Sequence, residues 1–189
     1  MTRKIPGKTN NTIHSAYNDK SEIIDISNNL LGISNNISYV KINFTGINID
    51  KQFIISICNL DKILLHTWYL NSSGYPFSYT ARYKSLHRHL LGRQEKGMVI
   101  DHINRNKLDN RLSNLRVITA KENSYNRTKN ANSNNKYKGV CKRGKKYVAV
   151  ISKDGVKKEI GGFLTEEDAA KCYDMMAEEL FGKYCAKNF

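Results

Sequence analysis

The feature of this sequence that most constrains its folding is a polar segment of nine residues, TKNANSNNK, at 128–136. It contains no apolar side chain larger than Ala, so it has almost nothing to contribute to a hydrophobic core. The chain has 189 residues, enough for one domain or two small ones. We therefore predict a linker at 128–136 that separates one folded region before it from a second region at 137–189.

The region before the linker changes character at Tyr39. Residues 1–38 are polar and rich in Asn, which predicts a mostly mobile N-terminal segment with at most a short helix. From Tyr39 to residue 127, short β-branched and aromatic runs alternate with turn residues, which is typical of a β-rich region. The predicted elements are strands at 39–44, 52–57, 98–102 and 114–118, a hairpin over 66–80, and a strand or short helix at 83–92 that Gly92 closes.

The region after the linker has the pattern of a small sheet covered by one helix. Three strand-like runs, YKGVCKR, KYVAVIS and KKEIGGF, are separated by turns at Gly144 and at Asp154-Gly155. Asp-Gly between alternating residues is a strong hairpin signal. Thr165, with Asp168 three residues later, predicts the start of a helix with one apolar face. The whole chain is therefore predicted to be α+β, with a three-stranded antiparallel sheet packed on one helix at its C-terminal end.

Charge gives the first indication of a partner. The chain carries 31 Lys and Arg against 17 Asp and Glu, a net charge of +14, which favours a polyanionic partner. Residues 136–158 hold nine Lys or Arg and one Asp, whereas 165–181 hold six acidic residues and one Lys. Because like charges repel the acidic helix from phosphate, we expect the sheet to face double-stranded DNA, whose major groove accepts a small sheet. A solvated basic sheet is the alternative.

Other classes of protein are disfavoured by what the sequence lacks. The four Cys residues, at 58, 141, 172 and 185, form no C-x-x-C pair, which argues against a zinc ribbon and indicates reduced thiols in an intracellular protein. The N-terminus has no secretory signal. No apolar run approaches the ~20 residues that a membrane helix needs. We therefore expect a soluble, intracellular protein with no membrane partner.

The stretch VIDHINRNKLDNRLSNLR contains the strongest chemical signal. Asp101 and His102 end a predicted strand, Asn114 begins another, and Asn123 lies on a helix that Thr119 opens with a capping box. Strand, loop, strand and helix fold back on themselves, so the four side chains can converge. A phosphodiester hydrolase needs a base and a divalent cation. An imidazole can be the base, and a carboxylate with an amide oxygen suits magnesium.

Residues from about Ser85 to Arg127 resemble the HNH homing endonucleases of the ββα-metal superfamily. The resemblance rests on the Asp-His pair, an Asn twelve residues after His102, and a second Asn nine residues further on. It implies a metal-dependent DNA endonuclease of the homing type with a ββα-metal HNH core at about 85–127. It further implies His102 as general base, Asn114 as the residue that orients it, and Asp101 and Asn123 as ligands of Mg²⁺ or Mn²⁺.

Basic residues around this core are expected to contact the DNA backbone. They are Arg105, Lys107, Arg111 and Arg116. His87 also matches a feature of the family, and we expect it, with Arg88, to be structural or to contact DNA.

Residues 137–189 resemble the Apetala/ethylene-response-factor DNA-binding domain in YKGV, KKYVAVI, GGF, EEDAAKCYD and the closing NF. In that family a three-stranded sheet enters the major groove with a helix behind it. The DNA contacts that the resemblance implies are Lys138, Lys142, Arg143, Lys146, Tyr147 and Lys158. Tyr147 stands where the family usually has Trp. The tandem order recurs in mobile endonucleases of phages and large DNA viruses, and the resemblance is compatible with a location in the cytoplasm or nucleus of an infected cell.

Two other functions stay open from the sequence. One is a non-catalytic DNA-binding regulator that uses the same two modules, and the other is a basic RNA-binding or assembly protein. The presence of all four HNH residues favours the nuclease over the regulator, and the C-terminal sheet lacks the paired stacking aromatics of RNA-reading sheets. The sequence leaves open whether the protein is a monomer or a weak dimer and whether it cuts one strand or both. With one metal site in an HNH centre, a monomer would more simply nick, and two cuts would need a dimer or a second event.

Overall fold

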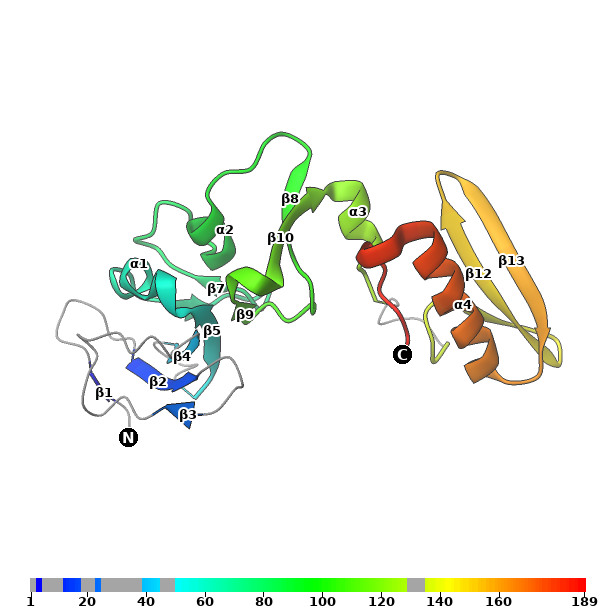
Figure 1. Ribbon diagram of the computed structural model, residues 1–189, viewed down its shortest axis with the longest axis horizontal. Coiled ribbons are helices and arrows are strands. Elements are labelled where there is room, and N and C mark those ends of the chain that lie inside the picture. Colours follow the sequence, from blue (N-terminus) through cyan, green and yellow to red (C-terminus); the bar gives the residue numbers. More distant parts are fainter. Residues whose placement is uncertain (1–2, 5–11, 18–22, 25–38, 45–49, 129–134) are drawn as a thin grey trace. The chain divides into compact units, whose positions relative to one another are not determined.

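The computed structural model describes residues 3–4, 12–17, 23–24, 39–44, 50–128 and 135–189. The chain divides into two compact units, Met1–Ile118 and Thr119–Phe189 (Figure 1). Residues 129–134 of the predicted linker, and most of the N-terminal segment that was expected to be mobile, lie outside the described residues. No helix in the described part of the chain is long and apolar enough to cross a membrane.

The first unit is built on a sheet whose central strands were predicted. Strands β4 (Tyr39–Asn43) and β5 (Gln52–Ser56) pair antiparallel, which confirms the predicted strands there. The sheet has the order β1-β2-β4-β5-β9, and β3 pairs with β2. The remaining strands are β1 (Arg3–Lys4), β2 (Thr12–Tyr17), β3 (Ile23–Ile24) and β9 (Asp109–Asn110). The segment at 12–17 is therefore a strand, although the sequence suggested mobility or a short helix.

The core of this unit follows from alternation along the strands. Val40 and Ile42 on β4, and Phe53 and Ile55 on β5, are all buried at every second position, as expected for a sheet with one covered face. Trp68 is fully buried against them and donates its indole N–H to the carbonyl of Ile63 at 2.9 Å. Two short helical segments cover this face, the 3-10 helix η2 (Ile57–Asn59) and α1 (Leu60–Leu64).

Two further pairs of strands and one helix lead to the Asp-His pair. The predicted hairpin is confirmed, with β6 (Tyr69–Leu70) antiparallel to β7 (Pro76–Phe77). The segment at 83–92 contains a helix, α2 (Leu86–Leu91), which ends at Gly92 with a φ of 77°. Leu86 anchors α2 in the core. Strands β8 (Met98–His102) and β10 (Leu115–Thr119) then pair with each other, and the 3-10 helix η3 (Leu112–Asn114) precedes β10.

The second unit confirms the predicted sheet and helix. Strands β11 (Val140–Arg143), β12 (Lys146–Lys153) and β13 (Val156–Phe163) form an antiparallel sheet, and α4 (Glu166–Phe181) packs on it. The Thr165 hydroxyl accepts the amide of Asp168 at 3.1 Å, as the capping pattern predicted. Helix α4 ends at Gly182, where the 3-10 helix η4 (Gly182–Tyr184) begins. The chain is thus a mixed α+β protein with several small sheets.

Helix α3 (Ala120–Tyr125) belongs to this second unit. Thr119 caps it through the predicted capping box with Glu122. Tyr125 stacks on Phe181 with ring centroids 4.0 Å apart, and its carbonyl accepts the amide of Ala186 at 3.1 Å. The stacking and the hydrogen bond tie α3 to the end of α4 and the C-terminal residues.

The closing residues Asn188 and Phe189 are also bound to α4. The buried carboxylate of Asp174 accepts their backbone amides at 2.8 and 3.0 Å and the Asn188 side-chain amide at 3.0 Å. Such charge-assisted hydrogen bonds are stronger than neutral ones. They explain why an Asn-Phe pair closes this module.

Candidate active site

The Asp-His pair lies at the end of β8, inside the first unit. Asp101 is 8% exposed and His102 is 5% exposed, although both side chains are polar. Buried polar groups of this kind need partners. Asn114, at the end of η3, is 6% exposed. The fourth predicted residue, Asn123, is on α3 in the second unit, and each of these residues is described within its own unit.

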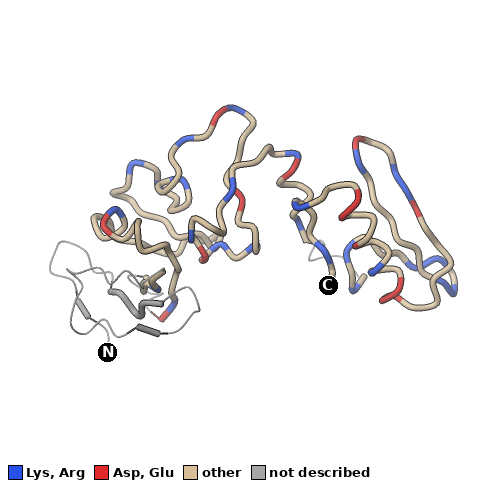
Figure 2. The backbone as a smooth tube through the Cα atoms, viewed as in Figure 1, with Lys and Arg blue, Asp and Glu red and all other residues tan. Residues whose placement is uncertain are grey.

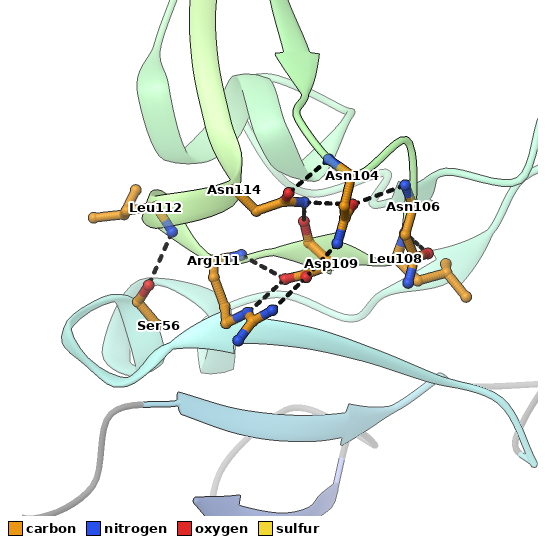
Figure 3. Close-up of polar contacts among 8 residues, drawn as sticks. All are labelled: Ser56, Asn104, Asn106, Leu108, Asp109, Arg111, Leu112 and Asn114. Atoms are coloured by element: carbon orange, nitrogen blue, oxygen red, sulfur yellow. Dashed lines mark hydrogen bonds and ion pairs between the residues drawn. The ribbon is translucent and has the colours of Figure 1, made fainter. Parts of the chain in front are cut away.

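Asn114 holds the loop that follows His102. Its Oδ1 accepts the backbone amide of Asn104 at 3.0 Å, and its Nδ2 donates to Asn104 Oδ1 at 2.9 Å and to the carbonyl of Asp109 at 2.7 Å (Figure 3). Its own carbonyl accepts the amide of Ile103 at 2.9 Å. These contacts close the loop over 103–114. The sequence predicted that Asn114 orients the ring of His102, whereas its side-chain hydrogen bonds go to the loop.

The ring of His102 is hydrogen-bonded to a residue that the sequence analysis did not select. His102 Nε2 and Asn110 Oδ1 are 3.2 Å apart, and Asn110 is fully buried. Burial lowers the pKa of His102, although the bond to Asn110 and the carboxylates of Asp101 and Asp109 partly oppose this. The ring is therefore neutral at pH 7, the form in which an imidazole accepts a proton.

Two aromatic rings pack against His102. The ring centroid of His87, on α2, is 5.5 Å from that of His102, and Tyr75 is 6.0 Å from His102 and 5.2 Å from His87. Burial, together with the neighbouring His102 and Arg88, lowers the pKa of His87 to about 4. The Nδ1 atom of His87 is buried and has no hydrogen-bond partner among the described residues. The prediction left His87 as structural or DNA-contacting, and these contacts place it beside the candidate base.

Two acidic residues near His102 are paired with arginines. Arg116 donates from Nε and Nη2 to Asp101 Oδ2, at 2.9 and 2.8 Å. Arg111 forms a two-pronged pair with Asp109, with Nε to Oδ1 at 2.8 Å and Nη2 to Oδ2 at 2.7 Å (Figure 3). Burial by itself raises the pKa of Asp109, but the hydrogen bonds and charge of Arg111 bring it below its usual value. Both carboxylates are thus held in fixed orientations.

The four basic residues predicted to hold the DNA backbone divide into two kinds. Lys107 donates to the carbonyl of Ser73 at 2.9 Å and lies over the Tyr75 ring. Arg111 and Arg116 are paired with the two carboxylates described above, so all three side chains have partners within the protein. Arg105 is exposed, and it lies in a tight turn with a φ of 64° in which its amide donates to the carbonyl of His102 at 2.8 Å.

The structure offers few protein ligands for a metal ion. No cluster of three or more His, Cys, Asp or Glu side chains that could hold one occurs among the described residues. Asp101 offers hard carboxylate oxygens, the kind that Mg²⁺ uses while it keeps several waters. Asn123 is partly buried, and its side chain makes no hydrogen bond within the described part of the chain. Asp101 in the first unit and Asn123 in the second each carry a side-chain oxygen of the hard type that Mg²⁺ accepts.

The predicted DNA contacts of the second unit lie on two faces of its sheet. Ala149 and Ile151 on β12 are buried against α4, and residues paired directly across strands point to the same side. Lys158 pairs with Ile151. Tyr147 lies two residues before Ala149 on β12, and therefore on the same side, and it pairs with Lys142. Lys142, Tyr147 and Lys158 are therefore on the α4 side.

The opposite face of this sheet, which we call the open face, has a different basic set. Arg143 pairs with Lys146, and Lys157 pairs with Ser152, all of them out of phase with Ile151. Lys157, which the sequence analysis did not select, therefore joins Arg143 and Lys146 there. Lys138 has a different role, since its Nζ donates to the Tyr125 carbonyl at 3.0 Å. Basic residues recur along the strands, whereas acidic residues gather on α4 (Figure 2).

Comparison with known proteins adds two findings. The model of the family described as HNH endonuclease matches residues 86–125, the segment from α2 to α3 that contains the Asp-His pair. A protein of Acanthamoeba polyphaga mimivirus, described as an uncharacterized HNH endonuclease, is 39% identical over 151 residues, which cover 77% of this chain and 74% of that protein. No solved structure matches the chain.

Proposed function

The chain belongs to the HNH endonuclease family and is a nuclease. From this premise we propose that it hydrolyses phosphodiester bonds of double-stranded DNA with a divalent metal ion, and that His102 is the general base. The proposal is supported by the state of His102: the ring is buried, it is hydrogen-bonded to Asn110 at 3.2 Å, and burial lowers its pKa. A neutral, fixed imidazole is what proton abstraction from water requires. The net charge of +14 suits a DNA substrate.

The residues around His102 have separate tasks in this proposal. Asp101 and Asn123 are the proposed ligands of Mg²⁺, with Mn²⁺ as a substitute. When bound, the ion supplies positive charge to the phosphate and the leaving oxygen. Arg116 holds the Asp101 carboxylate through Oδ2 at 2.8 and 2.9 Å, which fixes its orientation. Asn114 keeps the loop after His102 closed, so that the base stays at the end of β8.

Metal dependence is tested with the full chain on supercoiled plasmid and on DNA from the source genome. We expect cleavage with Mg²⁺ and none with EDTA. Asp101→Ala should raise the Mg²⁺ concentration needed for half-maximal cleavage, whereas Asp61→Ala, which removes an exposed carboxylate of α1, should leave it unchanged. An identical metal titration for wild type and Asp101→Ala would remove Asp101 from the ligand set.

We also propose that residues 137–189 of the second unit are a DNA-binding module of the Apetala/ethylene-response-factor type, with the linker at 128–136 before them. Its three-stranded antiparallel sheet, backed by the acidic helix α4, supports this assignment. The proposed contact surface is the open face, which carries Arg143, Lys146 and Lys157, because cations there can reach phosphate without the acidic helix between them.

A charge-matched pair of variants tests the open face. Arg143→Ala/Lys146→Ala should weaken DNA binding and lower the slope of log affinity against log salt concentration by about 2, roughly one unit for each lost phosphate contact. Lys142→Ala/Lys158→Ala removes the same charge from the α4 side and should change the DNA affinity and its salt dependence much less. Equal losses for the two pairs would mean that general charge, rather than the open face, attracts DNA.

We further propose a homing role, as the sequence predicted, and a single nick as the simpler of the two outcomes for a monomer. Mapping the cut ends on both strands of the target tests the second. Nicks in one strand at every protein concentration would support a monomer, and paired cuts that increase with concentration would support a dimer.

A further inference from the structure

Asn110 determines which nitrogen of His102 can accept a proton. Its Nδ2 lies 3.1 Å from the carbonyl oxygen of Lys107, and its Oδ1 lies 3.2 Å from His102 Nε2. A backbone carbonyl only accepts hydrogen bonds, so the NH₂ group of Asn110 must face Lys107 and its oxygen must face His102. An amide oxygen also only accepts. The proton of the neutral ring is therefore on Nε2, and the lone pair is on Nδ1.

The amide of Asn110 is fixed in this orientation by its surroundings. Asn110 is fully buried and lies on β9, where it pairs with the core residue Ile55 of β5. The preceding residue, Asp109, is held by Arg111 through two hydrogen bonds at 2.8 and 2.7 Å. Turning the amide over would set its NH₂ against the Nε2 proton and its oxygen against the Lys107 carbonyl, which loses both hydrogen bonds in a buried site.

The ring of His102 is fixed as well. Tyr75 and His87 pack against it with ring centroids at 6.0 and 5.5 Å. The Nε2–Asn110 bond and these two rings together leave little freedom for the imidazole to turn. The direction in which Nδ1 points is thus set by the same contacts that set its protonation.

We propose that Asn110 is a positioning residue that holds His102 in the tautomer with its proton on Nε2, so that Nδ1 takes the proton from the attacking water. The proposal rests on the proposed function of His102 as base. The two Asn residues of this loop then have different roles. Asn114 keeps the loop closed, and Asn110 fixes the tautomer of His102.

The decisive variant is Asn110→Leu, which has a similar shape and no acceptor. A buried N–H without an acceptor is unfavourable, so the proton of the neutral ring should move from Nε2 toward Nδ1. The base would then present the wrong nitrogen, and the cleavage rate at saturating DNA and Mg²⁺ should fall roughly 10- to 100-fold, a smaller loss than that of a triad with the wrong tautomer. DNA affinity should be unchanged.

Two matched variants separate positioning from a merely structural role. Asn110→Asp keeps an acceptor for Nε2. Most of its His102 rings should therefore carry the proton on Nε2, and its cleavage rate should lie between those of Asn110→Leu and the wild type. Asn114→Ala removes an amide from the same loop without touching the acceptor of Nε2, and should leave the tautomer unchanged. Fluorescence of the buried Trp68 shows whether each variant is folded.

The tautomer is read from long-range ¹H–¹⁵N spectra of the full chain with labelled histidine, and His102→Ala identifies the signals. We expect Nε2 protonated in the wild type and in Asn114→Ala, and a shift toward Nδ1 in Asn110→Leu together with the loss of rate. A wild-type ring protonated on Nδ1, an unshifted ring in Asn110→Leu, or a shifted ring with an unchanged rate would each overturn the proposal. Full cleavage by His102→Ala would instead overturn the proposed function, while the spectra still decide the tautomer.

Discussion

Replacing Asn114 by Ala should destabilise the first unit by an amount that its contacts define. The side chain makes three hydrogen bonds, at 3.0, 2.9 and 2.7 Å, from a position that is 6% exposed. At about 1 kcal/mol for each bond, the free energy of unfolding should fall by about 3 kcal/mol. This corresponds to a change of roughly a hundredfold in the unfolding equilibrium.

The chain contains a suitable probe for this measurement. Trp68 is its one tryptophan, and it is fully buried in the first unit. Its fluorescence in a urea titration therefore reports the unfolding of that unit rather than of the second. Linear extrapolation gives the free energy, and the dependence on urea should be the same for wild type and variant if only stability has changed.

A neighbouring substitution and a double variant complete the test. Ser113 is exposed beside Asn114, so Ser113→Ala should change the free energy by less than about 0.5 kcal/mol. Asn104→Ala combined with Asn114→Ala should cost less than the sum of the single changes, because each substitution alone already removes the bond from Asn114 Nδ2 to Asn104 Oδ1. A loss below about 1 kcal/mol for Asn114→Ala would mean that the loop does not depend on these bonds.

Three further outcomes follow from particular groups. Burial lowers the pKa of His87 to about 4; the unfolded ring binds its proton near pH 6.5. The free energy of unfolding should therefore be highest above about pH 6.5 and fall by roughly 3 kcal/mol toward pH 4. Urea titrations across this range should show a smaller fall for His87→Phe. Gly139→Ala should lower the melting temperature of the second unit by circular dichroism far more than Gly144→Ala, because both have positive φ but only at Gly139 would a Cβ overlap the ring of Tyr173. Mn²⁺ should restore cleavage after EDTA treatment and removal of Mg²⁺, because both ions accept hard oxygen ligands.

Local patterns in the sequence predicted the secondary structure well, for physical reasons. The capping box at Thr119 and the alternation of buried residues on β4 and β5 depend on residues only a few positions apart. The Asp154-Gly155 turn between β12 and β13 does as well. A short-range interaction can be recognised from spacing alone, because neighbouring residues have few alternative partners.

The orienting partner of His102 could not be chosen in the same way. The loop after His102 offers several amides, and spacing does not say which one reaches the ring. Asn110 is selected because β9 pairs in parallel with β5, a contact between residues 55 and 110. Such pairings depend on the three-dimensional path of the chain, and no local signal in the loop indicated this one.

The two faces of the C-terminal sheet show a similar limit. The charge pattern indicated correctly that basic residues belong to the strands and acidic ones to the helix. It did not divide the basic residues between faces, because the side on which Lys142 or Arg143 points depends on the register with β12. A shift of one residue in register would exchange the two sets.

The most direct test of the account is the cleavage rate of His102→Ala beside its affinity for DNA. Wild type and variant are incubated with supercoiled plasmid and with source-genome DNA, with Mg²⁺ and with protein in excess, and binding is measured in EDTA. If His102 is the base, the variant should cleave at least roughly 100-fold more slowly, the usual contribution of a general base, with unchanged DNA affinity. Cleavage at the wild-type rate, or an equal loss of rate and affinity, would contradict the assignment of His102 as the base.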